Sequence, residues 1–140
     1  MPFAAKDFYD LALWLSSQRP DESSHRTGIS RIYYAAHLTA RDKLSQKGWL
    51  MPSGKGDDHG LVIRELRRRR FSNRADELRY LKDLREHSDY HVDADRSVLN
   101  EDCQLCERIM LSSGAEVVSA EHLREALEVG QRLLPLLEKL

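Results

Sequence analysis

The chain has 140 residues, of which 41% are hydrophobic and 32% are charged, and its formal net charge is −1. This length suits one domain with its own core, and the composition excludes a disordered or collagen-like chain. No apolar run approaches the roughly 20 residues of a membrane span, and residues 1–8 lack a basic region followed by an apolar block. We therefore expect a single cytoplasmic domain over residues 1–140, with no membrane segment.

The first half of the sequence predicts two amphipathic helices. Apolar residues recur at the spacing of one helical face between residues 6 and 17, and Pro20 ends this helix because proline disfavours a helical residue before it. A second helix is expected from a cap within residues 21–24 to about residue 47. One face of its centre carries Ile29, Tyr33, Ala36 and Ala40. The small residues there let another helix come close, which predicts a central packing helix.

The middle of the chain predicts two shorter helices after a loop. Gly48 is expected to end the second helix, and residues 49–58 form the loop. A third helix over residues 59–70 is expected to be capped by Asp57 or Asp58. Asn73 is expected to cap a fourth helix. Its buried row would be Leu78, Leu81, Leu84 and Ser88.

The last part of the chain predicts two further helices. Asn100 is expected to cap a helix that ends near residue 112, and Ser119 is expected to cap the last one. Pro135 should kink the last helix or loosen its end, because proline removes a backbone donor. The fold class expected is therefore all-α, an antiparallel bundle of five to six helices around one core.

Positive charge gathers in one segment of the chain. Residues 64–85 contain nine Lys or Arg and four acids, so the segment carries a formal +5 whereas the remainder carries −6. Such an asymmetry attracts polyanions to one surface. As a nucleic-acid surface, this basic segment would contact the phosphate backbone of the nucleic acid. The alternative is a solvated helix end whose arginines pair with nearby acids. The residues expected to contact RNA are Arg67, Arg68, Arg70 and Arg74.

The segment 84–91, LREHSDYH, holds the densest set of reactive side chains. Arg85 carries a fork of donors that suits phosphate oxygens, and His91 can give or take a proton near neutral pH. Together they are the minimum for metal-independent RNA cleavage. On one continuous helix they lie about 120° apart, so they converge only if the helix ends near Asp89 or if two copies meet across a two-fold axis. The structural alternative is that Arg85 pairs with Asp89 and that His91 is an exposed residue at a helix C-terminus.

Four segments of the sequence resemble the HEPN domains of prokaryotes. They are SRIYYAAHLTARDKL, GDDHGLVIREL, LRYLKDLREHSDYH and AEHLREALEVGQRLLPLLEKL. The resemblance covers most of the chain apart from about residues 95–118, which look like an extra or extended helix. It implies a helical bundle, usually a homodimer, in which an Arg and a His line a cleft between subunits.

The resemblance also implies a function. Many HEPN members are metal-independent ribonucleases that act as toxins of toxin–antitoxin pairs or in antiviral defence, often beside a minimal nucleotidyltransferase. On this chain the catalytic pair would be Arg85 and His91, supported by Glu86 and Tyr90, with RNA as the substrate and no cofactor. The pattern Arg-x-x-Ser-Asp-Tyr resembles members that carry Asp-Tyr there and are not known to need the His. The alternative is therefore a non-catalytic interaction or nucleotide-binding module that partners a nucleotidyltransferase.

Other histidines and the cysteines allow further interpretations. His87, His91, Cys103 and Cys106 have the ligand types and near spacing of a zinc site, but the cysteines also fall in the apolar row of a helix, where free cysteines behave as small hydrophobic residues. His37 is expected to be a core or interface histidine rather than a catalyst. His59, at a helix start, is expected either to contact a phosphate or to take part in packing.

Overall fold

The computed structural model describes residues 2–90 and 118–140, and this part of the chain contains helices and no strand. The helices are α1 (Lys6–Gln18), α2 (Glu22–Gln46), α3 (Asp58–Arg68), α4 (Ser72–Tyr90) and α6 (Ala120–Glu138). The expected all-α bundle is confirmed. The helix expected over residues 100–112 lies outside the described residues.

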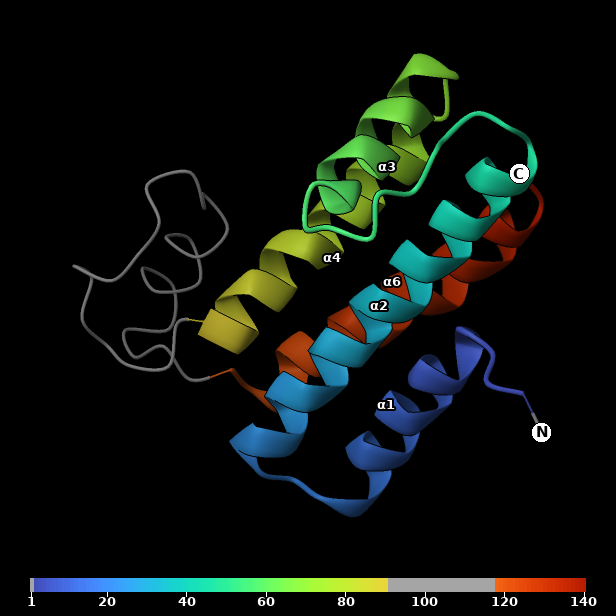
Figure 1. The fold of residues 1–140 in the computed structure, drawn as a ribbon. Helices are drawn as coiled ribbons and strands as arrows, with labels where there is room; N and C mark the ends of the chain where they lie inside the picture. The colour runs from blue at the N-terminus through green and yellow to red at the C-terminus, as the bar shows by residue number, and fades with distance from the viewer. Residues whose placement is uncertain (1, 91–117) are drawn as a thin grey trace.

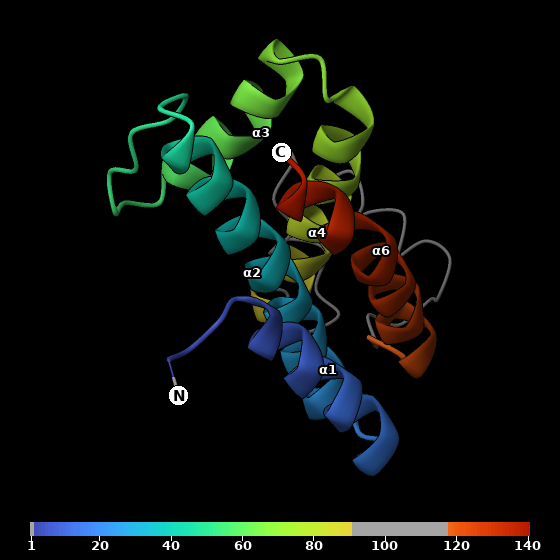
Figure 2. The same ribbon diagram turned by 90° about the vertical axis from the view of Figure 1, so that its right-hand side faces the viewer.

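Helix α2 is the centre of the bundle. It contacts all four other described helices, and α6 in turn contacts α1 and α4. Figure 1 shows α2 running through the middle of the molecule, with α1 on one side and α4 on the other. In Figure 2, after a quarter turn, α6 lies beside α4. The expected inner face of α2 is confirmed, because Ile29, Tyr33, Ala36 and Ala40 are all fully buried.

The ends of α2 follow the expected chemistry. Asp21 precedes the helix with extended backbone, and its Oδ1 accepts a hydrogen bond from the backbone N–H of Ser24 at 2.7 Å. This satisfies one of the amides that have no partner within the helix. At the other end Gly48 has a φ of 71°, a conformation that glycine adopts without steric cost.

The start of α3 corrects one capping prediction. Asp57 precedes the helix, but its side chain makes no capping hydrogen bond. Asp58 is buried, and its carboxylate accepts hydrogen bonds from the backbone N–H groups of Ser53 and Gly54 at 2.9 and 3.0 Å. The carboxylate therefore closes the loop before α3 instead of capping the helix.

The turn between α3 and α4 differs from the prediction by a few residues. α3 ends at Arg68 rather than near residue 70, and Arg70 has a φ of 66°. This left-handed residue turns the chain so that α4 begins at Ser72, and the expectation that Asn73 precedes and caps the helix is wrong. The expected buried row of α4 is confirmed, because Leu78, Leu81, Leu84 and Ser88 are all buried.

Helix α6 completes the core. The Ser119 side chain accepts from the backbone N–H of His122 and the His122 ring accepts from the backbone N–H of Ser119, which confirms the expected cap. The helix continues through Pro135 to Glu138. Among the described helices, none has an apolar stretch of the length that would cross a membrane.

Candidate functional site

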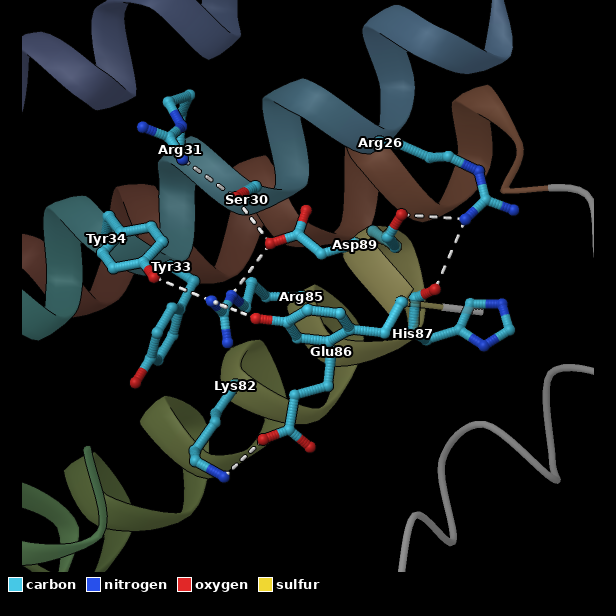
Figure 3. Close-up of polar contacts among 12 residues, drawn as sticks. Arg26, Ser30, Arg31, Tyr33, Tyr34, Lys82, Arg85, Glu86, His87 and Asp89 are labelled. Atoms are coloured by element: carbon cyan, nitrogen blue, oxygen red, sulfur yellow. Dashed lines mark hydrogen bonds and ion pairs between the residues drawn. The ribbon is translucent and has the colours of Figure 1, made fainter. Parts of the chain in front are cut away.

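Arg85 lies on the inner side of α4 in a cage of aromatic and acidic groups. Its Nη2 donates to the hydroxyl oxygens of Tyr34 at 2.7 Å and Tyr90 at 3.2 Å. Its Nε lies 3.0 Å from Oδ2 of Asp89, close enough for an ion pair but not aligned as a hydrogen bond. The side chain is 11% exposed, and the guanidinium carbon lies 5.1 Å from the Tyr34 ring centre and 5.2 Å from that of Tyr90. Figure 3 shows Arg85 between Tyr34 and Asp89.

Arg85 thus pairs with Asp89, as in the structural alternative for this segment, and the pair changes the electrostatics of the guanidinium. Burial by itself would lower the pKa of Arg85, but Tyr34, Tyr90 and Asp89 raise it above its usual value. The guanidinium is therefore charged at every physiological pH. Part of that charge is balanced by Asp89 within the same helix.

A polar network joins this cage to α2. The Ser30 hydroxyl donates to Oδ2 of Asp89 at 3.1 Å, and Arg31 donates to the Ser30 oxygen at 3.1 Å. One turn earlier on α2, Arg26 donates to the backbone carbonyl of Ser88 at 2.8 Å. Figure 3 shows these contacts along the end of α4. They fix the end of α4 against the central helix.

The two residues predicted to support the site have different surroundings. Glu86 is held by Lys82, whose Nζ donates to its Oε1 at 2.7 Å. Tyr90 is 64% exposed, although its hydroxyl accepts from Arg85. Its ring therefore covers one side of the guanidinium and leaves a large aromatic surface in solvent.

A pocket of about 510 Å³ opens between α3 and α4, and we call it the α3–α4 pocket. Its cationic lining consists of Arg64, Lys82 and Arg85, and its carboxylates are Asp57 and Glu86. The other lining residues are Gly56, His59, Gly60 and Leu61. The lining residues thus include three cations and two carboxylates. Glu86 pairs with Lys82, and Asp89, which does not line the pocket, pairs with Arg85, so Arg64 is the lining cation without an ion pair among the described residues.

A smaller pocket of about 250 Å³ adjoins it on the α2 side, and we call it the α2–α3 pocket. The two pockets share Gly56 and His59. The smaller pocket is also lined by Tyr34, His37, Leu38, Arg41, Gly54, Lys55 and Asp58. His59 therefore stands where the two pockets meet.

His59 and His37 form a stacked pair behind this boundary. Their ring centres are 4.3 Å apart, and Nδ1 of His59 lies 2.6 Å from the hydroxyl oxygen of Tyr33. His37 is 3% exposed, which confirms it as a core histidine. Burial, with a contribution from His59, lowers the pKa of His37 to about 3. Burial and the charges of Arg85 and Lys82 also lower the pKa of His59, so both rings are uncharged at neutral pH.

The arginines expected to bind RNA lie at the corner between α3 and α4. Arg67 pairs with Asp76 at 3.2 Å, Arg68 lies 3.9 Å from Glu65, and the Arg74 guanidinium stacks on Phe71. These contacts match the alternative of a helix end whose arginines pair with nearby acids. Of the four predicted residues Arg67, Arg68, Arg70 and Arg74, none lines either of the pockets described above.

Some predicted site residues lie outside the described part of the chain. His91, Cys103 and Cys106 belong to this group, so their geometry relative to Arg85 and His87 is not described. His87 itself is fully buried on α4. Within residues 2–90 and 118–140, no cluster of three or more His, Cys, Asp or Glu is arranged to hold a metal ion.

Comparison of the chain with protein-family models, curated proteins and solved structures gives no match. The site is therefore defined by its own geometry. The structure brings Arg85, Lys82, Arg64 and His59 to one pocket, whereas the sequence had placed His59 apart from Arg85. From its place at a helix start, His59 was expected either to contact a phosphate or to take part in packing, and its position beside Arg85 was not part of that expectation.

Proposed function

We propose that this chain is a HEPN-like protein that acts on RNA, with the α3–α4 pocket as the binding place of a backbone phosphate. The observation that carries the proposal is the gathering of Arg64, Lys82 and Arg85 from two helices around one opening. Guanidinium and ammonium groups are the usual partners of phosphate oxygens in protein–nucleic acid contacts. The segments that resemble HEPN domains include Arg64, Lys82 and Arg85, which supports the same class of ligand.

The proposed reaction is metal-independent cleavage, with Arg85 and His91 as the pair that the resemblance assigns. The RNA 2′-oxygen attacks the neighbouring phosphorus, the bond to the 5′-oxygen breaks, and the products are a 2′,3′-cyclic phosphate and a 5′-hydroxyl. His91 takes the 2′-hydroxyl proton or gives a proton to the 5′-oxygen. Arg85 stabilises the negative charge on the phosphate. A homodimer would bring a second copy of both residues to the cleft, as in a toxin or a defence ribonuclease.

A second candidate function is a non-catalytic interaction or nucleotide-binding module that partners a nucleotidyltransferase. The ion pair between Arg85 and Asp89 favours it, because Asp89 already balances part of the charge that a cleaving enzyme would direct at the phosphate. In that case the α3–α4 pocket binds a phosphate without cleavage.

The test is incubation of the purified full chain with single-stranded and structured RNA in EDTA, beside Arg85→Ala and His91→Ala. We expect cleavage products with cyclic phosphate ends from the wild type and from neither variant. Arg132→Ala is a matched control, because Arg132 lies on α6 and pairs with Glu77 at 2.7 Å. Cleavage that persists in both variants contradicts the catalytic assignment. RNA binding without cleavage supports the second candidate, and the absence of any salt-sensitive RNA binding contradicts the RNA proposal as a whole.

Arg64→Ala tests the pocket itself. Among the described residues Arg64 has no ion pair, and the residue is exposed, so we expect its removal to leave the fold intact. Loss of one phosphate contact should weaken RNA binding roughly threefold to tenfold and reduce the salt dependence by about one ion. Unchanged RNA affinity in this variant would contradict the claim that the α3–α4 pocket binds a phosphate of RNA.

A further inference from the structure

His59 stands between the two pockets, and only one of its ring nitrogens is used by the protein. Nδ1 lies 2.6 Å from the Tyr33 hydroxyl, whereas no described residue bonds Nε2. The ring is partly exposed and lines both openings. Nε2 is therefore the nitrogen that remains for a ligand in the pockets.

The hydrogen bond to Tyr33 decides which nitrogen of the neutral ring carries the proton. Tyr33 is fully buried on α2, and burial raises the pKa of its phenol, so the hydroxyl keeps its hydrogen. Among the described residues the hydroxyl has His59 Nδ1 as its one hydrogen-bond partner. A buried O–H donor needs an acceptor, so Tyr33 donates and Nδ1 accepts. In a neutral imidazole whose Nδ1 accepts, Nε2 carries the hydrogen and is a donor.

The surroundings of His59 keep the ring neutral. Burial is the main reason that the pKa of the ring is lowered. On α4 the ring faces Lys82, Arg85 and Glu86, and the two cations lower the pKa further. On α2 it faces the rings of Tyr33, Tyr34 and His37, and on its own helix it neighbours Asp58. A protonated ring would also carry a hydrogen on Nδ1, and this hydrogen would clash with the Tyr33 hydroxyl hydrogen that points at Nδ1. The structure therefore presents an uncharged N–H donor next to fixed cations.

We propose that His59 binds a phosphate oxygen through its neutral Nε2–H, and that Tyr33 is the positioning residue that holds this tautomer. The inference rests on the proposed function, since the phosphate of interest is that of RNA in the α3–α4 pocket. Lys82 and Arg85 supply charge there, and His59 adds a directional donor that does not depend on protonation. The ligand chemistry is a phosphate oxyanion, which a phosphodiester of RNA and inorganic phosphate share.

The proposal has a pH signature. A histidine that binds phosphate as an imidazolium gains affinity as the pH falls through its pKa. A neutral Nε2–H donor binds equally well over the range in which the ring remains neutral. We expect the contribution of His59, measured as the difference in RNA affinity between wild type and His59→Ala, to be constant between about pH 8 and pH 6.5, an interval over which an unperturbed histidine becomes about half protonated.

The experiment is ¹⁵N NMR of the histidine rings in the full chain, titrated with inorganic phosphate and with a single-stranded RNA oligonucleotide. His25 is an internal reference for the opposite tautomer, because its Nδ1 lies 3.2 Å from the Val118 carbonyl, which can only accept. We expect His59 to show the Nε2–H tautomer, and its Nε2 signal to move on addition of either ligand. Tyr33→Phe should yield a mixture of both tautomers at His59.

Binding measurements complete the test. His59→Ala should weaken RNA binding about fivefold, as expected for one neutral hydrogen bond, and His59→Gln should restore part of the loss because its amide is again an N–H donor. An Nδ1–H tautomer in the wild type, or an Nε2 signal that neither ligand moves, overturns the inference even if Tyr33→Phe fails to fold. RNA affinity that is equal in wild type and His59→Ala overturns the inference and leaves the proposed function standing. If inorganic phosphate moves the His59 signal but the chain does not bind RNA, the phosphate contact of His59 is supported and the proposed function is contradicted.

Discussion

Oδ2 of Asp89 lies 3.0 Å from Nε of Arg85, one helical turn before it on α4, and also accepts a hydrogen bond from Ser30 on α2. The same carboxylate oxygen therefore orients Arg85 and ties α4 to the central helix. An ion pair of this kind limits how strongly the guanidinium attracts a second anion. The balance between Asp89 and an incoming phosphate decides how strongly Arg85 binds RNA.

Asp89→Asn tests this balance. The amide keeps the size of the side chain but removes the charge, so we expect RNA affinity to rise roughly threefold to tenfold at low salt. The free energy of unfolding should fall by about 1–2 kcal/mol, because the pair is only partly exposed. Asp83→Asn is the matched control, since Asp83 pairs with Arg79 at 3.1 Å with the same spacing on the same helix. Fluorescence anisotropy and urea unfolding measure both effects, and equal RNA affinity in the two variants contradicts the role of Arg85.

Glu86→Gln tests whether Glu86 competes with a phosphate for Lys82. Glu86 lines the α3–α4 pocket and neutralises Lys82 through a contact of 2.7 Å. Removal of this carboxylate leaves the ammonium group free for a phosphate, so RNA affinity should rise by a few fold and become more sensitive to salt. Binding isotherms at several salt concentrations measure the change. A loss of affinity would mean that Glu86 positions Lys82 for RNA instead of competing with it.

The sequence predicted those features that depend on local spacing. The buried row of α4, including Leu81 and Leu84, and the pairing of Arg85 with Asp89 follow from residues three or four apart on one helix. The cap of α2 by Asp21 is similarly local. Such relationships need no knowledge of how the helices pack.

The pocket could not be predicted in the same way. It depends on the position of α3 against α4, which brings His59 beside Arg85, and on the position of α3 against α2, which brings Nδ1 of His59 to the Tyr33 hydroxyl. Neither relationship is encoded in a spacing along one helix. The start of α4 was misplaced for a related reason, because the left-handed turn at Arg70 moves the helix start to Ser72.

The buried ring of His37 should make the free energy of unfolding depend on pH. Its folded-state pKa of about 3 lies below the ordinary value near 6.5, so the folded protein binds fewer protons than the unfolded chain between these values. The contribution of the neutral His37 ring to the free energy of unfolding is complete above pH 6.5 and is lost as the pH falls toward 3. The slope for one such group is about 1.4 kcal/mol per pH unit. His37→Leu should therefore flatten the fall in the free energy of unfolding between pH 6.5 and 5, measured by urea titration. A slope identical to that of the wild type would contradict the burial of a neutral ring.

Substitution of glycine by alanine should have opposite effects on the free energy of unfolding at Gly130 and at Gly60. A Cβ on Gly130 of α6 would lie 2.9 Å from the Tyr9 ring and 3.0 Å from a methyl of Ile32, so the contact between α6 and its neighbours requires glycine there. Gly130→Ala should lower the free energy of unfolding by about 1–3 kcal/mol through overpacking. Gly60 lies inside α3, and a Cβ there meets nothing within 4 Å, so Gly60→Ala should raise stability by about 0.5–1 kcal/mol through the lower entropy of the unfolded chain. Thermal and urea unfolding of the two variants measure the difference. A stable Gly130→Ala protein would mean that α6 packs less closely on α1 and α2 than described.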